Sequence, residues 1–236
     1  MHRPFVVSHA ACKGHAPENT LLGVRRAIEL GAEGIEIDVH ASRDGVPVLI
    51  HDETVDRTTD GSGEVSKMTL ARLRKLDAGE GERIPTLAET LELTKGRVVL
   101  VIEVKQPGIE EQVLQVVRDQ KAVGDCVVHS FYPQVVARFR ALEPAMPAAL
   151  LTSGLDAADW GQLFTFALCL NAQGVSIFFP KVDADLVRRA HLRKLSFYTW
   201  TVDEVQDMRR LRDCGVDAII TDYPDRLRQA LEAASR

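Results

Sequence analysis

Short apolar runs alternate with helix-like segments along the whole chain. Residues 20–30, 110–120 and 183–194 carry apolar side chains at the spacing of an amphipathic helix. The runs that flank such segments have the length and the β-branched composition of buried strands. They are FVVSH (5–9), GIEIDVH (34–40), RVVLVIEVK (97–105), CVVHSF (126–131), AALLT (148–152), GVSIFF (174–179), SFYTWTV (196–202) and DAIITDYP (217–224). Strands separated by helices are joined by right-handed crossovers, so the pattern predicts a parallel sheet.

One further apolar run, VPVLIHD at residues 46–52, does not fit this alternation. Only residues 42–45 separate it from the preceding strand, which is too short for a parallel crossover. Because Asp44-Gly45 is a favourable hairpin turn, we expect residues 46–52 to return antiparallel to that strand. The eight remaining strands, each followed by a helix, predict an α/β fold of the (β/α)8 TIM-barrel type.

The longest departure from the barrel pattern covers residues 53–85. Its first half is polar and rich in turn-forming residues, and a short helix is expected near residues 69–77. No repeat, low-complexity tract or linker interrupts the chain. Residues 1–236 are therefore expected to form a single domain, for which this length is typical of a barrel.

Charge and composition narrow the class of partner. The net charge is −5 and no block of lysine and arginine occurs, so nucleic acid and anionic membrane surfaces are not the expected partners. No apolar run has the length of a membrane span, and residues 5–7 are too short for a secretory signal. The four cysteines are scattered without a C-x-x-C pair, as expected for reduced thiols. A cytoplasmic protein without a membrane anchor is expected, and nothing indicates its oligomeric state.

Carboxylates gather at the predicted carboxyl ends of the strands, where TIM barrels place their active sites. Glu36 and Asp38 are two residues apart on one strand and so point to the same face, and Glu103 ends the next barrel strand. Buried carboxylates repel one another unless a cation lies between them, and such a set favours Mg²⁺ or Ca²⁺. The alternative is that they form salt bridges with Lys105 or an arginine.

Histidines lie at the same strand ends. His9 ends the first strand, and the hairpin brings His51 roughly opposite Glu36 and Asp38. Since imidazole titrates near neutral pH, His9 and His51 are candidates for an acid and a base, although a lone histidine is more often structural. We expect His40 to form a hydrogen bond at the rim rather than to bind a metal, and His129 to be structural.

Two further side chains could contact a substrate. Lys105 follows Glu103 by two residues and points the same way, so it could neutralise a phosphate or simply pair with that glutamate. Trp200 ends a later strand, where it could form an apolar wall of the site or fill the barrel core.

Taken together, these motifs resemble the glycerophosphodiester phosphodiesterase family over nearly the whole chain. Any one of them is weak alone, whereas their order along the chain is specific. The matching segments are His9 followed by Ala16-Pro17-Glu18-Asn19-Thr20, then residues 34–39, 44–52, 56–59, 84–87, 103–105, 130–131, 200–202, 215–217 and 221–222.

The resemblance implies a metal-dependent TIM-barrel hydrolase that releases glycerol 3-phosphate and an alcohol from glycerophosphodiesters. By position, Glu36, Asp38 and Glu103 match the family's metal ligands, and His9 and His51 match its catalytic pair. In the mechanism usually proposed for the family, the glycerol 2-hydroxyl attacks phosphorus to give a cyclic phosphate, while one histidine accepts a proton and the other protonates the leaving alcohol. The resemblance also implies substrate-binding positions at Glu18, Lys105, Trp200 and Ala10.

Position 10 departs from the family pattern. The family has His-Arg-Gly where this chain has His9-Ala10-Ala11, and the arginine of that pattern binds phosphate. Losing such a contact costs about 2–4 kcal/mol, or roughly 30- to 1,000-fold in rate. Lys105 or Lys13 could compensate in part, as a point charge without the guanidinium fork. Three hypotheses follow: an active phosphodiesterase of small glycerophosphodiesters, one with shifted substrate choice such as lysophospholipids, or a binding or inactivated homologue without turnover.

Overall fold

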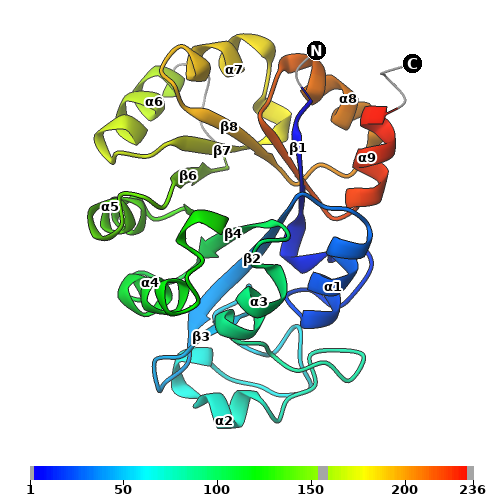
Figure 1. Cartoon of the computed structure of the whole chain (residues 1–236), viewed down its shortest axis with the longest axis vertical. Coiled ribbons are helices and arrows are strands. Elements are labelled where there is room, and N and C mark those ends of the chain that lie inside the picture. The colour runs from blue at the N-terminus through cyan, green and yellow to red at the C-terminus, as the bar shows by residue number, and fades with distance from the viewer. Residues whose placement is uncertain (1–2, 154–158, 233–236) are drawn as a thin grey trace.

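The computed structural model describes residues 3–153 and 159–232. At its centre, eight parallel strands are paired in the order β1-β9-β8-β7-β6-β5-β4-β2, and β1 pairs back to β2 to close a barrel (Figure 1). The predicted TIM barrel is therefore confirmed. The strands are β1 (Phe5–Ser8), β2 (Gly34–Ala41), β4 (Val99–Val104), β5 (Cys126–Ser130), β6 (Ala148–Thr152), β7 (Gly174–Phe178), β8 (Ser196–Trp200) and β9 (Ala218–Thr221).

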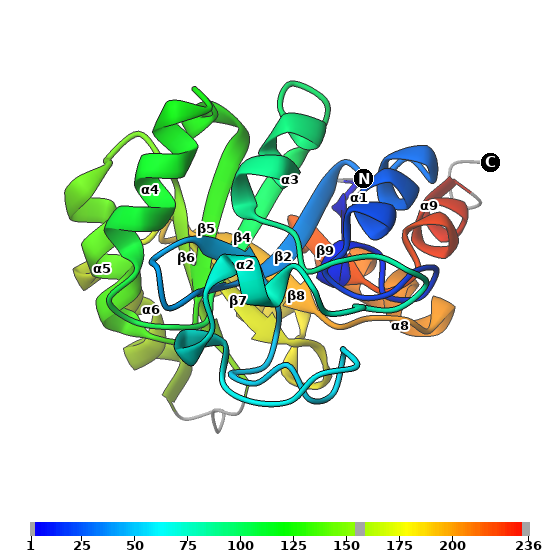
Figure 2. The same cartoon turned by 90° about the horizontal axis from the view of Figure 1, so that it is seen from below.

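Helices surround the barrel and follow one another along its outside (Figure 2). They are α1 (Leu21–Glu29), α3 (Leu87–Thr94), α4 (Glu110–Asp119), α5 (Pro133–Leu142), α6 (Trp160–Cys169), α7 (Ala184–His191), α8 (Val205–Cys214) and α9 (Pro224–Glu232). Thr20 and Asp183 cap α1 and α7 by accepting a backbone N–H bond, and Thr86 with Glu89 forms a capping box at α3. No helix within the described residues is long and apolar enough to cross a membrane.

The return strand β3 (Pro47–Leu49) lies antiparallel to β2, as the hairpin spacing predicts. It is shorter than the predicted run 46–52. Ile50 still donates its N–H to the Asp38 carbonyl at 3.0 Å, and the chain leaves the sheet at His51. On its other side, β3 contacts residues 85–86, through a bridge between Val48 and Thr86 and a bond from the Leu49 N–H to the Pro85 carbonyl oxygen. This ending releases the His51 side chain from the sheet and places it near the ends of the barrel strands.

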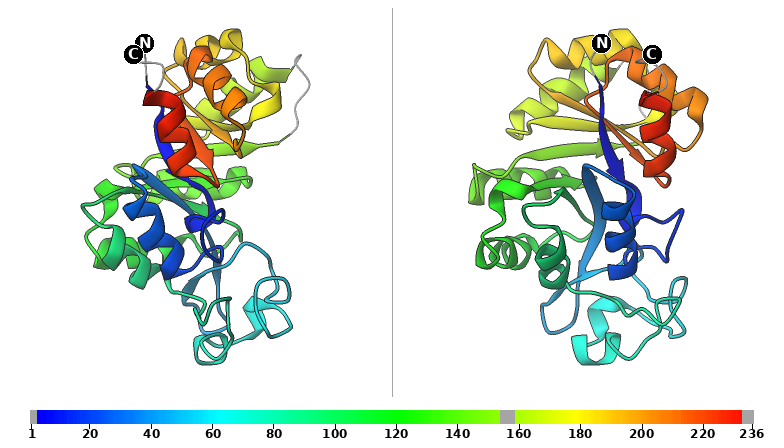
Figure 3. Two further views of the ribbon diagram at one scale, coloured as in Figure 1. Left: turned by 90° about the vertical axis from the view of Figure 1, so that its right-hand side faces the viewer. Right: turned by 45° about the vertical axis from the view of Figure 1, so that its right-hand side comes forward.

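The excursion after β3 forms its own small layer at one end of the molecule (Figure 3). It contains the short helices η2 (Val65–Lys67) and α2 (Leu70–Leu73), the second of which lies within the predicted helix at 69–77. A separate buried cluster holds it together, made of Val48, Ile50, Val55, Val65, Met68, Leu73, Ala78 and Ile84. Because Ile50 and Val55 of this cluster flank the segment that carries His51, the excursion anchors that segment at both of its ends.

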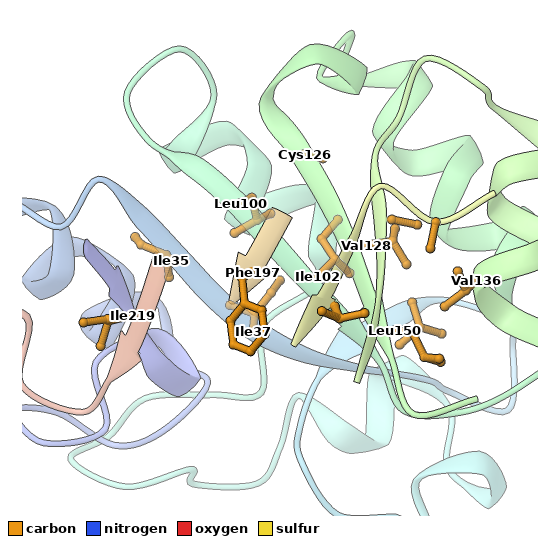
Figure 4. Close-up of a cluster of buried hydrophobic side chains, with 14 of the residues drawn as sticks. Ile35, Ile37, Leu100, Ile102, Cys126, Val128, Val136, Leu150, Phe197 and Ile219 are labelled. Atoms are coloured by element: carbon orange, nitrogen blue, oxygen red, sulfur yellow. The ribbon is translucent and has the colours of Figure 1, made fainter. Parts of the chain in front are cut away.

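Side chains alternate between the two faces of the barrel strands. Ile35, Ile37 and Leu100 belong to the main core between the strands and the helices (Figure 4). Val7 and Ile220 point the other way and fill the barrel interior. Nearer the carboxyl ends of the strands the interior side chains become polar, and these side chains form the candidate site.

The loop after β1 has an unusual backbone. Ala10, Ala11 and Cys12 have φ angles of 43°, 63° and 105°, although none of them is glycine. Such left-handed conformations cost about 1 kcal/mol or more per residue, so surrounding contacts must hold them. Helix α1 provides one contact, because a Cβ at Gly23 would lie 2.7 Å from the Ala11 carbonyl oxygen. Glycine at position 23 thus allows α1 to press against this loop.

Candidate active site

A cavity of about 180 Å³ opens at the carboxyl ends of the barrel strands. One side of it is charged and the other is apolar and aromatic. Its lining consists of His9, Glu36, His51, Glu103, Lys105, His129, Phe131, Leu151, Trp200, Thr201 and Ile220. These residues come from strands far apart in the sequence, and barrel closure brings them together.

Three carboxylates lie together at the charged side, and two of them, Glu36 and Glu103, line the cavity. Glu36 and Asp38 share the inner face of β2, and Asp38 lies opposite Glu103 in the parallel register with β4. One oxygen atom from each of the three lies within 4.8 Å of the others, the separation needed to hold one metal ion. Burial and the charge of Asp38 raise the pKa of Glu36 to about 8 and also raise the pKa of Glu103. A cation would relieve this repulsion.

Each carboxylate has a different set of partners. The Lys105 ammonium lies 2.8 Å from Glu103 Oε1 and 3.5 Å from Asp38 Oδ1, so the predicted glutamate–lysine pair forms in this structure. Asn19 donates to Asp38 Oδ2 at 2.8 Å and accepts from the Asp38 N–H at 3.0 Å. Glu36 Oε2 accepts from the Ala10 N–H at 2.9 Å. Among the described residues, the buried Glu36 Oε1 has no hydrogen-bond partner.

His9 is held by a carboxylate of its own. Its Nδ1 donates to Asp222 Oδ1 at 2.6 Å, and its Nε2 lies 4.0 Å from Glu36 Oε2. Burial acts to lower the pKa of His9, but the bond to Asp222 and the charges of Glu36 and Asp222 outweigh burial and raise the pKa to about 9. The bond to Asp222 engages Nδ1 as a donor, so Nε2 is the ring nitrogen that remains for a substrate in the cavity.

His51, like His9, is hydrogen-bonded to a carboxylate. Its Nδ1 donates to Asp52 Oδ1 at 2.7 Å, and its Nε2 accepts from the Lys105 ammonium at 3.1 Å. Arg57 donates to both oxygens of Asp52 and to both oxygens of Glu18. The bonds from Arg57 hold the pKa of Asp52 well below its usual range. Because an ammonium group has no acceptor, His51 Nε2 is the acceptor in its contact with Lys105.

Aromatic rings form the apolar side of the cavity. The Phe131 ring stands edge-on to Trp200 with centroids 5.6 Å apart, and Phe178 lies 5.4 Å from Trp200. Phe131 is still 39% exposed, so this wall continues to the mouth of the cavity. A substrate bound here would meet charged groups at one end and aromatic surface at the other.

Comparison with known proteins agrees with this geometry. Residues 9–226 match the Glycerophosphoryl diester phosphodiesterase family. The chain belongs to this family. A glycerophosphodiester phosphodiesterase of Caldanaerobacter subterraneus subsp. tengcongensis is 37% identical over 238 residues, which cover 95% of this chain and 96% of the relative.

Two solved structures of similar proteins support the assignment. A putative glycerophosphoryl diester phosphodiesterase from Silicibacter pomeroyi superposes with a TM-score of 0.92 at 28% identity, covering 99% of this chain and 95% of that one. A phosphodiesterase from Oleispira antarctica, solved in complex with the product sn-glycerol-3-phosphate, gives a TM-score of 0.89 at 30% identity. It covers 97% of each chain.

In this glycerophosphoryl diester phosphodiesterase family member, most of the residues singled out from the sequence meet at the cavity. Asp38 lies just behind it, held by Asn19 and facing Lys105. Glu18 is placed against Arg57 rather than in the cavity lining, and Ala10 contributes its backbone N–H to Glu36. The predicted rim bond of His40 is present as a contact of 3.3 Å between its Nε2 and the His51 carbonyl oxygen.

Three residues of this family member's site received no role from the sequence. Asp222 and Asp52 orient the two histidines, and Arg57 fixes Asp52. Signals for them exist: Asp52 directly follows His51, and Asp222 directly follows the last barrel strand, which closes beside the first. His129, expected to be structural, also lines the cavity.

Proposed function

We propose that this chain hydrolyses glycerophosphodiesters to glycerol 3-phosphate and an alcohol. The observation that carries the proposal is that two histidines, each hydrogen-bonded to a carboxylate, share a cavity with Glu36 and Glu103, which form a three-carboxylate cluster with the adjacent Asp38. Acid–base groups beside a cation site are what phosphodiester cleavage requires. The family and the product-bound Oleispira antarctica relative support the choice of substrate.

We propose Glu36, Asp38 and Glu103 as the ligands of a divalent cation, Mg²⁺ or Ca²⁺. The unpartnered Oε1 of Glu36 and the mutual distance of at most 4.8 Å fit this assignment. The donors are all carboxylate oxygens, which hard cations prefer. A bound cation supplies positive charge against the negative charge that develops on the phosphate oxygens.

The hydrogen bonds give the two histidines different roles in the proposal. His51 Nε2 carries a lone pair, which accepts from Lys105 here and becomes free for the substrate proton when the ammonium turns toward the phosphate; Asp52 stabilises the positive ring that protonation would create. We therefore assign His51 as the base. His9 has a raised pKa and a proton to give, so we assign it as the acid. Each carboxylate partner then holds its ring in the tautomer that the role needs.

In the proposed reaction, the glycerol 2-hydroxyl oxygen attacks phosphorus while its proton passes to His51 Nε2. The bond between phosphorus and the alcohol oxygen breaks, and that oxygen takes a proton from His9 Nε2. Water then attacks the cyclic phosphate with the two histidines in exchanged roles, and glycerol 3-phosphate results. Lys105, 2.8 Å from Glu103 and 3.1 Å from His51, can turn its charge toward the phosphate.

The test is release of glycerol 3-phosphate from glycerophosphocholine with Mg²⁺ or Ca²⁺, with a lysophospholipid assayed in parallel. Turnover that EDTA abolishes supports the proposed function. Turnover of the lysophospholipid alone would show that substrate choice has shifted, as the alanine at position 10 permits. Silence toward every diester, with glycerol 3-phosphate still bound, would instead identify a binding protein.

Introducing arginine at position 10 is expected to raise kcat/KM. Ala10 lies next to His9 and its N–H contacts Glu36, so a guanidinium here would start beside the acid and the cation site. A charge-assisted bidentate contact to phosphate contributes about 1.5–3 kcal/mol, or roughly 10- to 150-fold. Steady-state kinetics should compare Ala10→Arg with Ala10→Lys. Lysine supplies the charge alone, so the difference between the two variants measures what the paired N–H donors of the guanidinium contribute. Equal rates for wild type and both variants would show that this site works without a guanidinium.

Asp222→Asn is expected to lower kcat by about 100-fold with little change in KM, because the amide no longer fixes the His9 tautomer or stabilises its charge. Asp225→Asn is a matched control: Asp225 makes a similar bond of 2.9 Å to His15, outside the cavity lining. The control should keep wild-type kcat. Equal losses in the two variants would mean that the effect comes from folding rather than from His9.

A further inference from the structure

The cavity is lined by buried polar atoms that the described part of the protein leaves without partners. Four such atoms belong to its lining: Glu36 Oε1, Trp200 Nε1 and both ring nitrogens of His129. Buried polar groups are normally hydrogen-bonded, and each exception needs an explanation. Glu36 is explained by the proposed cation. The carboxylate cluster does not account for the other three atoms, which belong to His129 and Trp200.

His129 is the most unusual member of this group. It lies on β5, opposite Glu103 of β4 and Ala149 of β6, and is only 1% exposed. Its ring stands edge-on to Tyr198, with centroids 4.7 Å apart at 83°. Burial lowers the pKa of His129 to about 3, so the ring is neutral and carries one N–H donor and one acceptor. Both remain unpaired within the described structure.

Such a residue is costly for a barrel interior. A buried imidazole without partners loses its bonds to water and gains none in return, so an apolar side chain of similar size would serve the fold better. The position of His129 is between the charged side of the cavity, at Glu103 on the neighbouring strand, and the aromatic side, at Phe131 just after the end of β5. A molecule that spans the cavity from one side to the other must pass it.

We propose that His129 is a substrate-binding residue, whose neutral ring donates a hydrogen bond to a phosphodiester oxygen in the cavity. The inference rests on the proposed function. Trp200 Nε1, also a neutral and unpartnered donor, would bind the same anionic group. A role as a metal ligand is not favoured, because the cluster of candidate ligand atoms among the described residues holds the three carboxylates and not His129. Two donors facing an anion leave the acid and the base free for proton transfer.

The experiment compares His129→Leu and His129→Gln with wild type in steady-state kinetics, thermal unfolding and calorimetric binding of glycerol 3-phosphate. We expect His129→Leu to lower kcat/KM and product affinity about 10- to 100-fold with an unchanged or higher Tm, since an unpaired polar group has been removed from the interior. His129→Gln should keep both within about 5-fold of wild type, because its amide N–H can replace the ring donor. Tyr198→Phe is the packing control, since it keeps the edge-on ring and should leave activity unchanged.

A second measurement needs no variant to fold. In ¹⁵N-labelled wild type, the ring-nitrogen signals of His129 should shift when glycerol 3-phosphate is titrated in. Wild-type kinetics in His129→Leu, or His129 signals that do not move on saturation, would show that the ring serves packing or a bound water only. If wild type itself turns over no diester, the proposed function fails. The product-binding comparison then still decides whether His129 contacts a phosphate ligand.

Discussion

Replacing His51 by alanine is expected to lower kcat on glycerophosphocholine by about 10³- to 10⁴-fold, near the upper range for loss of general acid–base catalysis. The side chain accepts from Lys105, donates to Asp52 and lines the cavity, but it is not one of the candidate metal ligands. Cation binding should therefore be unchanged in the variant. The measurement is kcat at saturating substrate, together with the calorimetric affinity for the cation.

His9→Ala should cause a similar loss on this substrate, and a change of leaving group separates the two roles. An ester of glycerol phosphate with p-nitrophenol has a leaving group that departs without a proton. On this substrate the variant that lacks the acid, His9→Ala, should recover most of its activity, whereas His51→Ala should stay impaired. Recovery of His51→Ala instead would reverse the assignment of acid and base.

His191→Ala is the matched control for both variants. His191 donates from Nε2 to Asp217 at 2.8 Å, outside the cavity lining, so it reproduces a histidine–aspartate pair without the chemistry. It should keep wild-type kcat. Activity within 10-fold of wild type in His51→Ala would contradict the proposed base, whatever its Tm.

The fold could be predicted because its evidence is local. Each strand and helix shows its own apolar period, and the short turn at Asp44-Gly45 permits only an antiparallel return. The exact end of that return could not be predicted, because β3 stops where residues 85–86, distant in the sequence, pair with its other edge. Where this strand ends depends on tertiary contacts, which cannot be predicted from the local sequence VPVLIHD.

The residues that gather in the cavity were also predictable, but their contacts with one another were not. The bond between His9 and Asp222 joins residues 213 positions apart and follows from barrel closure between β1 and β9. The pairing of Glu18 with Arg57 depends on how the excursion folds back, which polar turn-rich sequence does not specify. In CVVHSF, valines occupy both faces of the strand, so the alternation gave no sign that His129 points inward.

Removal of the cation is expected to lower activity more than about 10³-fold, and its binding should depend strongly on pH. In the metal-free protein the pKa of Glu36 is raised to about 8 by burial and by Asp38, so a cation must displace a proton at neutral pH. Affinity for Mg²⁺ or Ca²⁺ should therefore rise up to about tenfold per pH unit between pH 6 and 8 and level off above. Calorimetry in two buffers of different ionisation enthalpy at pH 7 should show proton release on binding.

In the metal-free protein, stability should fall as pH rises, whereas the affinity for the cation should rise. The pKa values of Glu36 and His9 are raised above their unfolded values, to about 8 and about 9, so both groups favour folding when protonated. That contribution is complete below the unfolded pKa values of 4.5 and 6.5, and it is lost progressively as pH rises from there to about 8 for Glu36 and about 9 for His9. The metal-free Tm should fall over this range, while a cation at 100 times its Kd restores about 2.7 kcal/mol. At one constant cation concentration, stabilisation by the cation should be larger at pH 9 than at pH 6, because the affinity is higher at pH 9.

Glu36→Gln tests the origin of both effects. The amide cannot titrate and is a weaker ligand, so the variant should lose most of its affinity for the cation and most of its activity. The cation affinity that remains should no longer depend on pH. Glu29→Gln is the matched control, because Glu29 is exposed in a pair with Arg26 on α1 and should change none of the three. Cation affinity that is flat with pH in wild type, or unchanged in Glu36→Gln, would move the cation away from this cluster. It would also leave the buried charges of β2 and β4 to be balanced by Lys105 and His9.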